Sequence, residues 1–357
     1  MQSTSTQDSR ATHWAVNLVL AAGAVALALE PIMWLVRTWH APAYDSAGGW
    51  VFGAAVALFV WSMTSERVST THRHDQWAYA LLLMTAIVRL TGHILAIDVV
   101  GALALTIDVF AIGLLVGVGE RERAISPFWL AVVFSFSLPL ERIVQRVVGY
   151  GLQHVSATGS CGLLGLFFDD LQCRGVEMTL GGQNVLVDLP CSGAQGLILL
   201  GVLFSGLAAL ARPSLKQSIV GVALAAAAAL VSNVLRISAL AVGIAFPAEI
   251  GGIDVMSQPW HDLIGLVALA LGTIPLVIWA QRAGDGPETS DDDGEHDADS
   301  TPPKPAGFVS RLRAIVRGTE PPRVTPRERH DQPADATDDE SDGQQASGAP
   351  SHRSLRS

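Results

Sequence analysis

The chain has 357 residues, of which 50% are hydrophobic and only 16% are charged, and its mean hydropathy is +0.37. A soluble protein carries about 25% charged residues, so this composition excludes a soluble globular protein. The formal net charge of −10 excludes a basic nucleic-acid binder. Residues 283–357 hold 16 acidic and 9 basic residues, so most of the negative charge lies in this tail. We therefore predict a polytopic membrane protein with an acidic tail.

A helix crosses a bilayer in about 20 apolar residues, and the chain contains eight candidate stretches. The polar segment 1–13 lacks the basic region and cleavage site of a secretory signal, so we expect a cytoplasmic N-terminus followed by a retained anchor. The sequence predicts an all-α fold with four transmembrane helices in 14–126 and four more in 127–282. The candidate spans are about 14–36, 48–64, 77–97, 99–118, 127–149 (interrupted by Pro139), 191–211, 217–241 and 261–281.

The distribution of Lys and Arg predicts the orientation, because short cytoplasmic loops carry the excess of these residues. With both termini inside, only Arg37 and Arg174 lie in outside loops, and Arg142 and Arg146 lie near an outer helix end. The opposite orientation reverses this bias, so we expect both termini in the cytoplasm. The basic residues then inside are Arg10, Arg67, Arg73, Arg121, Arg123, Arg212, Lys216 and Arg282.

The segment 150–190 is expected to be the one sizeable loop outside the membrane. Within it, Val176–Leu180 and Asn184–Leu189 are short β-prone runs around Gly181-Gly182, which predicts a β-hairpin. An alternative for its beginning is that residues 141–155 continue as an amphipathic helix with one apolar face.

The tail 283–357 is rich in Asp, Pro, Gly, Ser and Thr and has almost no apolar clusters, so we expect it to be disordered in the cytoplasm. Its short basic stretch Phe308–Arg317 is compatible with contact to anionic lipid, but a solvated linker is the favoured interpretation.

Three polar residues occupy matching depths in the last three spans. Cys191 lies 21 residues before Arg212, Arg236 lies 20 residues after Lys216, and His261 lies 21 residues before Arg282. At about 1.5 Å per residue, each is about 30 Å from the inner boundary, at the outer interface. Consecutive spans are usually neighbours, so we expect the three side chains to lie close together.

These residue types together are typical of nucleophilic catalysis. A cysteine at a helix start is activated by the helix dipole, a histidine can move its proton, and an arginine can stabilise an oxyanion. Asn233 lies on the same helical face as Arg236 and is a candidate to orient it, and Asp262 is a weaker candidate to orient His261. Singly, each residue is more simply a core cysteine, an interfacial histidine or an arginine anchor. Because the three residues share one depth, a catalytic site is an alternative about as well supported as these separate structural roles.

Residues from about 127 to 281 resemble the exosortase/archaeosortase family of integral-membrane cysteine transpeptidases. The resemblance is carried by VLVDLPCSG around Cys191, NVLR ending at Arg236, and HDLIG beginning at His261. Family members read close to A-C-S-G, N-x-x-R and H-x-x-x-G there. Pro190 departs from the common alanine, and Gln195 sits where many relatives have an arginine or glutamine.

The resemblance implies that Cys191 is the nucleophile, His261 the general acid/base and Arg236 the residue that stabilises the oxyanion or substrate. It implies cleavage at the outer face of the cytoplasmic membrane, often alongside exopolysaccharide genes. The partners implied are exported proteins that end in a sorting motif, a transmembrane helix and a basic cluster, and an acceptor nucleophile. No metal or organic cofactor is implied.

A different class, a non-catalytic transporter or an exopolysaccharide-assembly component, is the alternative. It is favoured by charged residues in the first half, of which Arg89 and Asp108 lie at similar depth. Buried charges usually pair, so we predict an ion pair in preference to a proton path. The sequence has no inverted repeat of the transporter type.

The two remaining cysteines, Cys161 and Cys173, lie 12 positions apart in the predicted outside segment. The compartment there is oxidising, so a disulfide is permitted, and Cys191 must stay a free thiol to act. We predict a Cys161–Cys173 bridge, with two unpaired thiols as the alternative.

Overall fold

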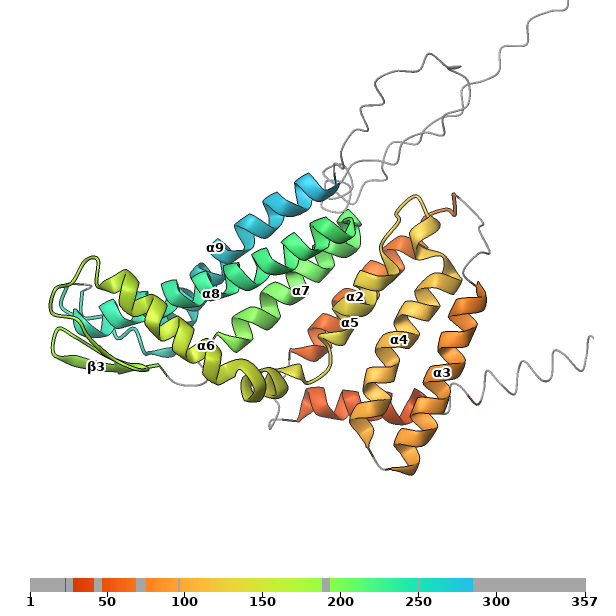
Figure 1. Cartoon of the computed structure of the whole chain (residues 1–357), viewed down its shortest axis with the longest axis horizontal. Helices are drawn as coiled ribbons and strands as arrows, with labels where there is room; N and C mark the ends of the chain where they lie inside the picture. The colour runs from red at the N-terminus through yellow and green to blue at the C-terminus, as the bar shows by residue number, and fades with distance from the viewer. Residues whose placement is uncertain are drawn as a thin grey trace, which may run out of the picture. The chain divides into compact units, whose positions relative to one another are not determined.

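The structure is a computed structural model that describes residues 23, 28–41, 47–68, 75–95, 97–187, 193–249 and 251–284. It is mostly helical, with one small antiparallel sheet (Figure 1). Residues 28–40 are helical, and the elements that follow are α2 (Gly48–Met63), α3 (Asp75–Ile94), α4 (Asp98–Val116), the 3-10 turn η2 (Val118–Glu120), α5 (Pro127–Ser135), α6 (Leu140–Leu164), β1 (Gln172–Arg174), β2 (Glu177–Leu180), β3 (Gln183–Leu186), α7 (Ala194–Ala211), α8 (Leu215–Ala245) and α9 (Gln258–Gly284).

The predicted multi-pass helical fold is confirmed, but the count of eight spans is not. Five helices in the described part of the chain are long and apolar enough to cross a membrane, namely α3, α4, α7, α8 and α9. The second candidate span forms α2, which is apolar but shorter. Of the first candidate span, 14–36, the structure describes only part, and the helix there runs on to residue 40.

The interruption predicted at Pro139 in the fifth span, 127–149, is present, and it divides the span into two helices. Ser126 caps the start of α5 and Pro127 occupies its first turn, but α5 ends at Ser135 and α6 begins only after Pro139. The break is held by a neighbouring helix, because Trp39 Nε1 donates to the Ser137 carbonyl at 2.7 Å. Gly48 of α2 lies so close that an added Cβ would be 2.4 Å from the same oxygen.

The expected outside loop 150–190 is helical in its first part, since α6 continues to Leu164. The alternative of a helix through 141–155 is therefore the correct one, and this helix is longer than expected. The β-hairpin is confirmed: β2 pairs with β3 in antiparallel register around Gly181 and Gly182, whose φ angles of 57° and 74° suit a tight turn. The strand β1, which we did not predict, pairs with the other edge of β2.

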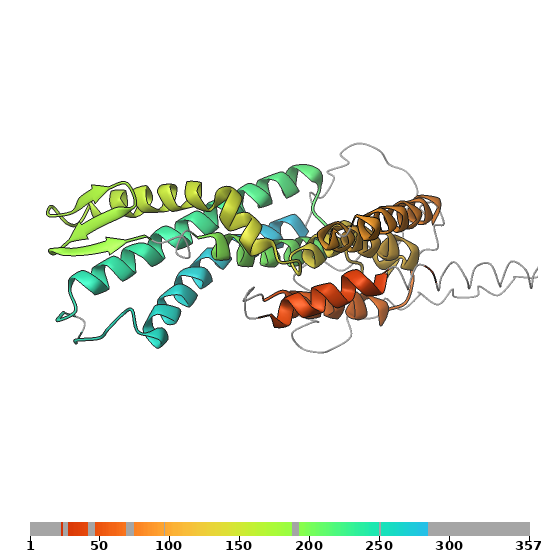
Figure 2. The ribbon, with the colours of Figure 1, turned by 90° about the horizontal axis from the view of Figure 1, so that it is seen from below.

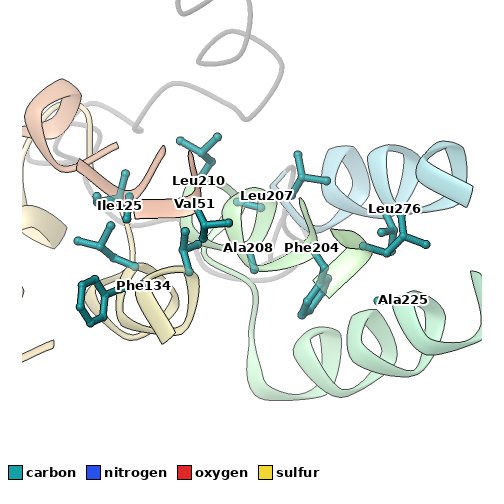
Figure 3. Packing of buried hydrophobic residues seen from close by; sticks show 14 of the residues in the cluster. Val51, Ile125, Phe134, Phe204, Leu207, Ala208, Leu210, Ala225 and Leu276 are labelled. Atoms are coloured by element: carbon teal, nitrogen blue, oxygen red, sulfur yellow. The ribbon is translucent and has the colours of Figure 1, made fainter. Parts of the chain in front are cut away.

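The helices and the sheet pack around two separate hydrophobic clusters. The larger joins α2, α4, α5, α7, α8 and α9, and Figure 3 shows part of it, including Phe134, Phe204 and Leu276. The second, which we call the cap cluster, joins the end of α6, the sheet and the last third of α8. The ribbon in Figure 2 shows the sheet lying beside α6. Its buried members are Ala157, Leu164, Met178, Val187, Ile237 and Ala241.

The cap cluster is tied together covalently. Cys161 at the end of α6 and Cys173 in β1 form the expected disulfide, with their Cα atoms 6.4 Å apart. Phe168, which follows α6, stacks on Phe246 at the end of α8 with ring centroids 5.4 Å apart. The sheet is thereby joined both to α6 and to α8.

A buried ion pair joins α3 to α4. Arg89 donates to Asp108, and both side chains are buried. The other carboxylate oxygen of Asp108 accepts a hydrogen bond from Thr85, which is fully buried. The predicted pairing of Arg89 with Asp108 is therefore present. Glu30 and His93 make a second, exposed contact at 2.6 Å.

Several predictions fall on residues outside the described part of the chain. These are the polar N-terminus 1–13, the disorder of the tail beyond residue 284, and Cys191 together with its neighbours from 188 to 192.

Candidate functional site

The long helix α8 runs from the larger hydrophobic cluster to the cap cluster, and Arg236 lies on it between the two. A capping box of Ser214 and Gln217 begins the helix, and its first half packs in the larger cluster. Ile237, the residue after Arg236, already belongs to the cap cluster. Arg236 therefore lies at the level where the two clusters meet, about 30 Å along the helix from its start.

The structure brings Arg236 and His261 together. His261 lies in the first turn of α9, which packs along α8. Arg236 Nη2 is 3.3 Å from His261 Nε2. An arginine can only donate, so in this hydrogen bond His261 Nε2 is the acceptor.

A glycine in α9 makes room for the guanidinium. Gly265 lies one turn after His261, and a Cβ added to it would be 3.3 Å from Arg236 Nε. This Nε is buried and has no hydrogen-bond partner among the described residues. A buried donor without a partner is costly.

The start of α7 lies against the same part of α8. Gly193 precedes the helix with φ of 94°, a conformation that residues with a side chain rarely adopt. A Cβ added to Gly193 would be 2.9 Å from the amide of Asn233. The chain two residues after Cys191 is thus in contact with a residue one turn before Arg236.

Three polar side chains on α6, which sequence analysis missed, also reach this region. Ser156 Oγ accepts a hydrogen bond from Asn233 Nδ2 at 2.9 Å, Ser160 Oγ donates to the Val234 carbonyl at 3.2 Å, and Gln153 Nε2 donates to the Val187 carbonyl. All three are buried. Their spacing of three and four residues in an amphipathic helix was the available signal.

The other predicted residues lie less centrally. Asp262 Oδ1 is 3.6 Å from His261 Nδ1, beyond hydrogen-bond distance, and its side chain is exposed. Gln195 is exposed in the first turn of α7. Among the described residues, no three His, Cys, Asp or Glu side chains group closely enough to hold a metal ion.

Comparison with known protein families decides the membership of the chain. A family model described as transmembrane exosortase matches residues 39–278. The chain belongs to the transmembrane exosortase family. The exosortase match begins well before residue 127, so it includes α2, α3 and α4, and it ends before the acidic tail. No curated protein and no solved structure matches the chain.

Proposed function

We propose that this exosortase is a cysteine transpeptidase or protease whose site consists of Cys191, Arg236 and His261. The contact between Arg236 and His261, 3.3 Å apart on two different helices, is the observation that carries the proposal. The contact of Gly193 with Asn233 supports it, because Gly193 follows Cys191 by two residues and Asn233 precedes Arg236 by three.

Each residue has a defined part in the proposed reaction. The Cys191 sulfur attacks the scissile carbonyl carbon and its proton passes to the imidazole of His261. The guanidinium of Arg236 stabilises the oxyanion of the tetrahedral intermediate. When the carbon–nitrogen bond breaks, His261 returns the proton to the leaving amine and a thioester remains on Cys191. An acceptor nucleophile or water then attacks the thioester and releases the thiol.

The proposed substrates are exported proteins that end in a sorting motif, a transmembrane helix and a basic cluster. A substrate held by one helix presents its cleavable segment at the outer interface, where depth counting puts the three site residues. We propose that both termini of the exosortase face the cytoplasm and that the site faces outward from the cytoplasmic (inner) membrane. The acceptor is a nucleophile on that outer side.

The test is processing of a co-expressed reporter that ends in a Pro-Glu-Pro motif, an apolar helix and a basic cluster. Cys191→Ala and His261→Gln are each expected to abolish cleavage. His154→Gln is the matched control, because His154 lies on α6 and packs against Tyr150 instead of Arg236. Unchanged processing in the Cys191→Ala protein would overturn the proposal.

A further inference from the structure

A row of buried polar side chains runs along one face of α6. Gln153, Ser156 and Ser160 are 8%, 0% and 0% exposed. They alternate with Ala157 and Leu164 of the cap cluster, so the row lies within an otherwise apolar contact. Polar groups in such surroundings are retained when each has a defined partner.

The first member of the row holds the chain that leads to Cys191. Gln153 Nε2 donates to the carbonyl of Val187, four residues before Cys191. The amide of Val187 donates to the Val176 carbonyl at 3.1 Å, and its side chain is buried in the cap cluster. Both backbone groups and the side chain of Val187 are therefore held in place.

The other members hold the helix that carries Arg236. Ser156 Oγ receives the hydrogen bond of Asn233, and Ser160 Oγ donates to the Val234 carbonyl. Asn233 is in turn the residue against which Gly193 lies, two residues after Cys191. Close approach of the two helices is possible here because Gly159 faces Val234, where a Cβ would be only 2.8 Å away.

From these contacts we propose that Gln153 is a positioning residue for the nucleophile of this site. The proposal rests on the proposed function for the identity of the group being positioned. Val187 on one side and Gly193 on the other fix the ends of the five-residue segment that contains Cys191. Gln153 holds the first end by its hydrogen bond to Val187. Ser156 holds the second end indirectly, because it accepts a hydrogen bond from Asn233, which contacts Gly193. Because both hydrogen bonds come from one face of α6, this helix holds both Val187 and the part of α8 that contacts Gly193.

The test compares Gln153→Leu with Gln145→Leu. The first substitution removes the donor to Val187 and keeps a similar volume. The second is the matched control, since Gln145 lies two turns earlier on α6 and donates to Glu141 at 3.2 Å. Gln153→Met, with a more adaptable apolar side chain, replaces Gln153→Leu if that protein folds poorly.

The first readout is the mobility of a nitroxide attached to Cys191 by a methanethiosulfonate reagent. Cys191 is the only cysteine outside the disulfide, so labelling of the oxidised full-length protein is specific. We expect an immobilised line shape in the parent protein and in Gln145→Leu. In Gln153→Leu we expect the rotational correlation time to fall severalfold while thermal unfolding stays cooperative, with a midpoint lowered by the loss of one buried hydrogen bond.

The second readout is cleavage of the same reporter by unlabelled protein. We expect Gln153→Leu to lower the rate at saturating reporter by roughly a hundredfold, with half-saturation unchanged, because a small displacement of a reacting group costs rate and leaves remote binding intact. An unchanged line shape or an unchanged cleavage rate in Gln153→Leu would overturn the positioning role. Failure of the proposed function is seen separately, as cleavage that persists in Cys191→Ala.

Discussion

At the scale of single residues, two glycines lie against the part of α8 that carries Arg236. Gly193 lies against Asn233 and Gly265 lies against Arg236, and neither position leaves space for a further carbon atom without a shift of its neighbour. Other glycines of the same helices, such as Gly196, have nothing within 4 Å of an added Cβ. These differences provide matched pairs of substitutions.

Gly193→Ala is expected to destabilise the protein and to slow cleavage. The left-handed backbone at Gly193 costs a residue with a Cβ about 1–2 kcal/mol, and the contact with Asn233 adds to this. Gly196→Ala, within α7, is expected to be neutral or to stabilise by up to about 1 kcal/mol. Thermal unfolding in detergent and cleavage of the reporter measure both. Equal behaviour of the two variants would contradict the contact with Asn233.

Arg236→Lys is expected to lower acylation of Cys191 by at least about a hundredfold, the cost of losing one oxyanion donor. Lysine keeps the positive charge but lacks the planar fork of donors that lies beside His261. Trapping of the thioester intermediate measures the rate. Arg282→Lys, at the other end of α9, is the control and should acylate at the parent rate. Parent-like acylation in Arg236→Lys would make Arg236 a membrane anchor only.

Arg89→Met is expected to destabilise the protein by about 3–5 kcal/mol, because it leaves the Asp108 carboxylate buried without its charged partner. The double variant Arg89→Met with Asp108→Leu should lose less, since no charge then remains. Unfolding by denaturant in mixed micelles measures both, with exposed Arg282→Met as the control. A loss in the double variant as large as in the single one would contradict a structural role for the pair.

At the scale of elements, α6 is the helix on which the cap cluster depends. It supplies the polar row, packs along α8 and is joined to β1 by the disulfide. Its departure from a single fifth span has a local cause in Pro139 and a tertiary one in Trp39, which binds the Ser137 carbonyl left by the break. Because the chain breaks between α5 and α6, the polar face of α6 can lie toward α8.

Loss of the disulfide is expected to lower the free energy of unfolding by about 3 kcal/mol in the chain-entropy model. The double variant Cys161→Ser with Cys173→Ser tests this by denaturation in detergent. Non-reducing peptide mapping by mass spectrometry should give a Cys161–Cys173 crosslinked peptide, with Cys191 open to alkylation. Labelling of all three cysteines without reductant would contradict the bridge.

At the scale of the whole molecule, the basic residues at helix ends predict which side of the membrane each connection occupies. Arg212 and Lys216 flank the connection between α7 and α8, and Arg282 lies in the last turn of α9. The sheet and the cap cluster lie near the C-terminal ends of α6 and α8. On α8 this is the end opposite Lys216. This arrangement predicts that the cap cluster lies outside the cell.

Alkaline phosphatase fusions test this orientation, because the enzyme is active only outside the cytoplasm. A fusion after Pro213 should be inactive, and a fusion after Ala248, beyond the end of α8, should be active. The positive-inside bias is the physical basis of this expectation. The reverse pattern would invert the topology and place the candidate site in the cytoplasm.

Much of the fold followed from the sequence because it depends on local properties. Apolar length predicted the helices, and Gly181-Gly182 predicted the hairpin, since both glycines adopt the positive φ that a tight turn requires. Rise per residue put Arg236 and His261 at one height, and the two are in contact. Height along a helix is set by the chain itself, so counting residues is sufficient.

Only the tertiary structure decided which groups at that height meet from the side. The contact of Gly193 with Asn233, the space that Gly265 leaves for Arg236, and the hydrogen bonds of Gln153, Ser156 and Ser160 all join segments far apart in the sequence. Such contacts depend on how closely two helices pack and on how each is rotated about its axis. Those quantities are properties of the pair of surfaces, and neither helix encodes them alone.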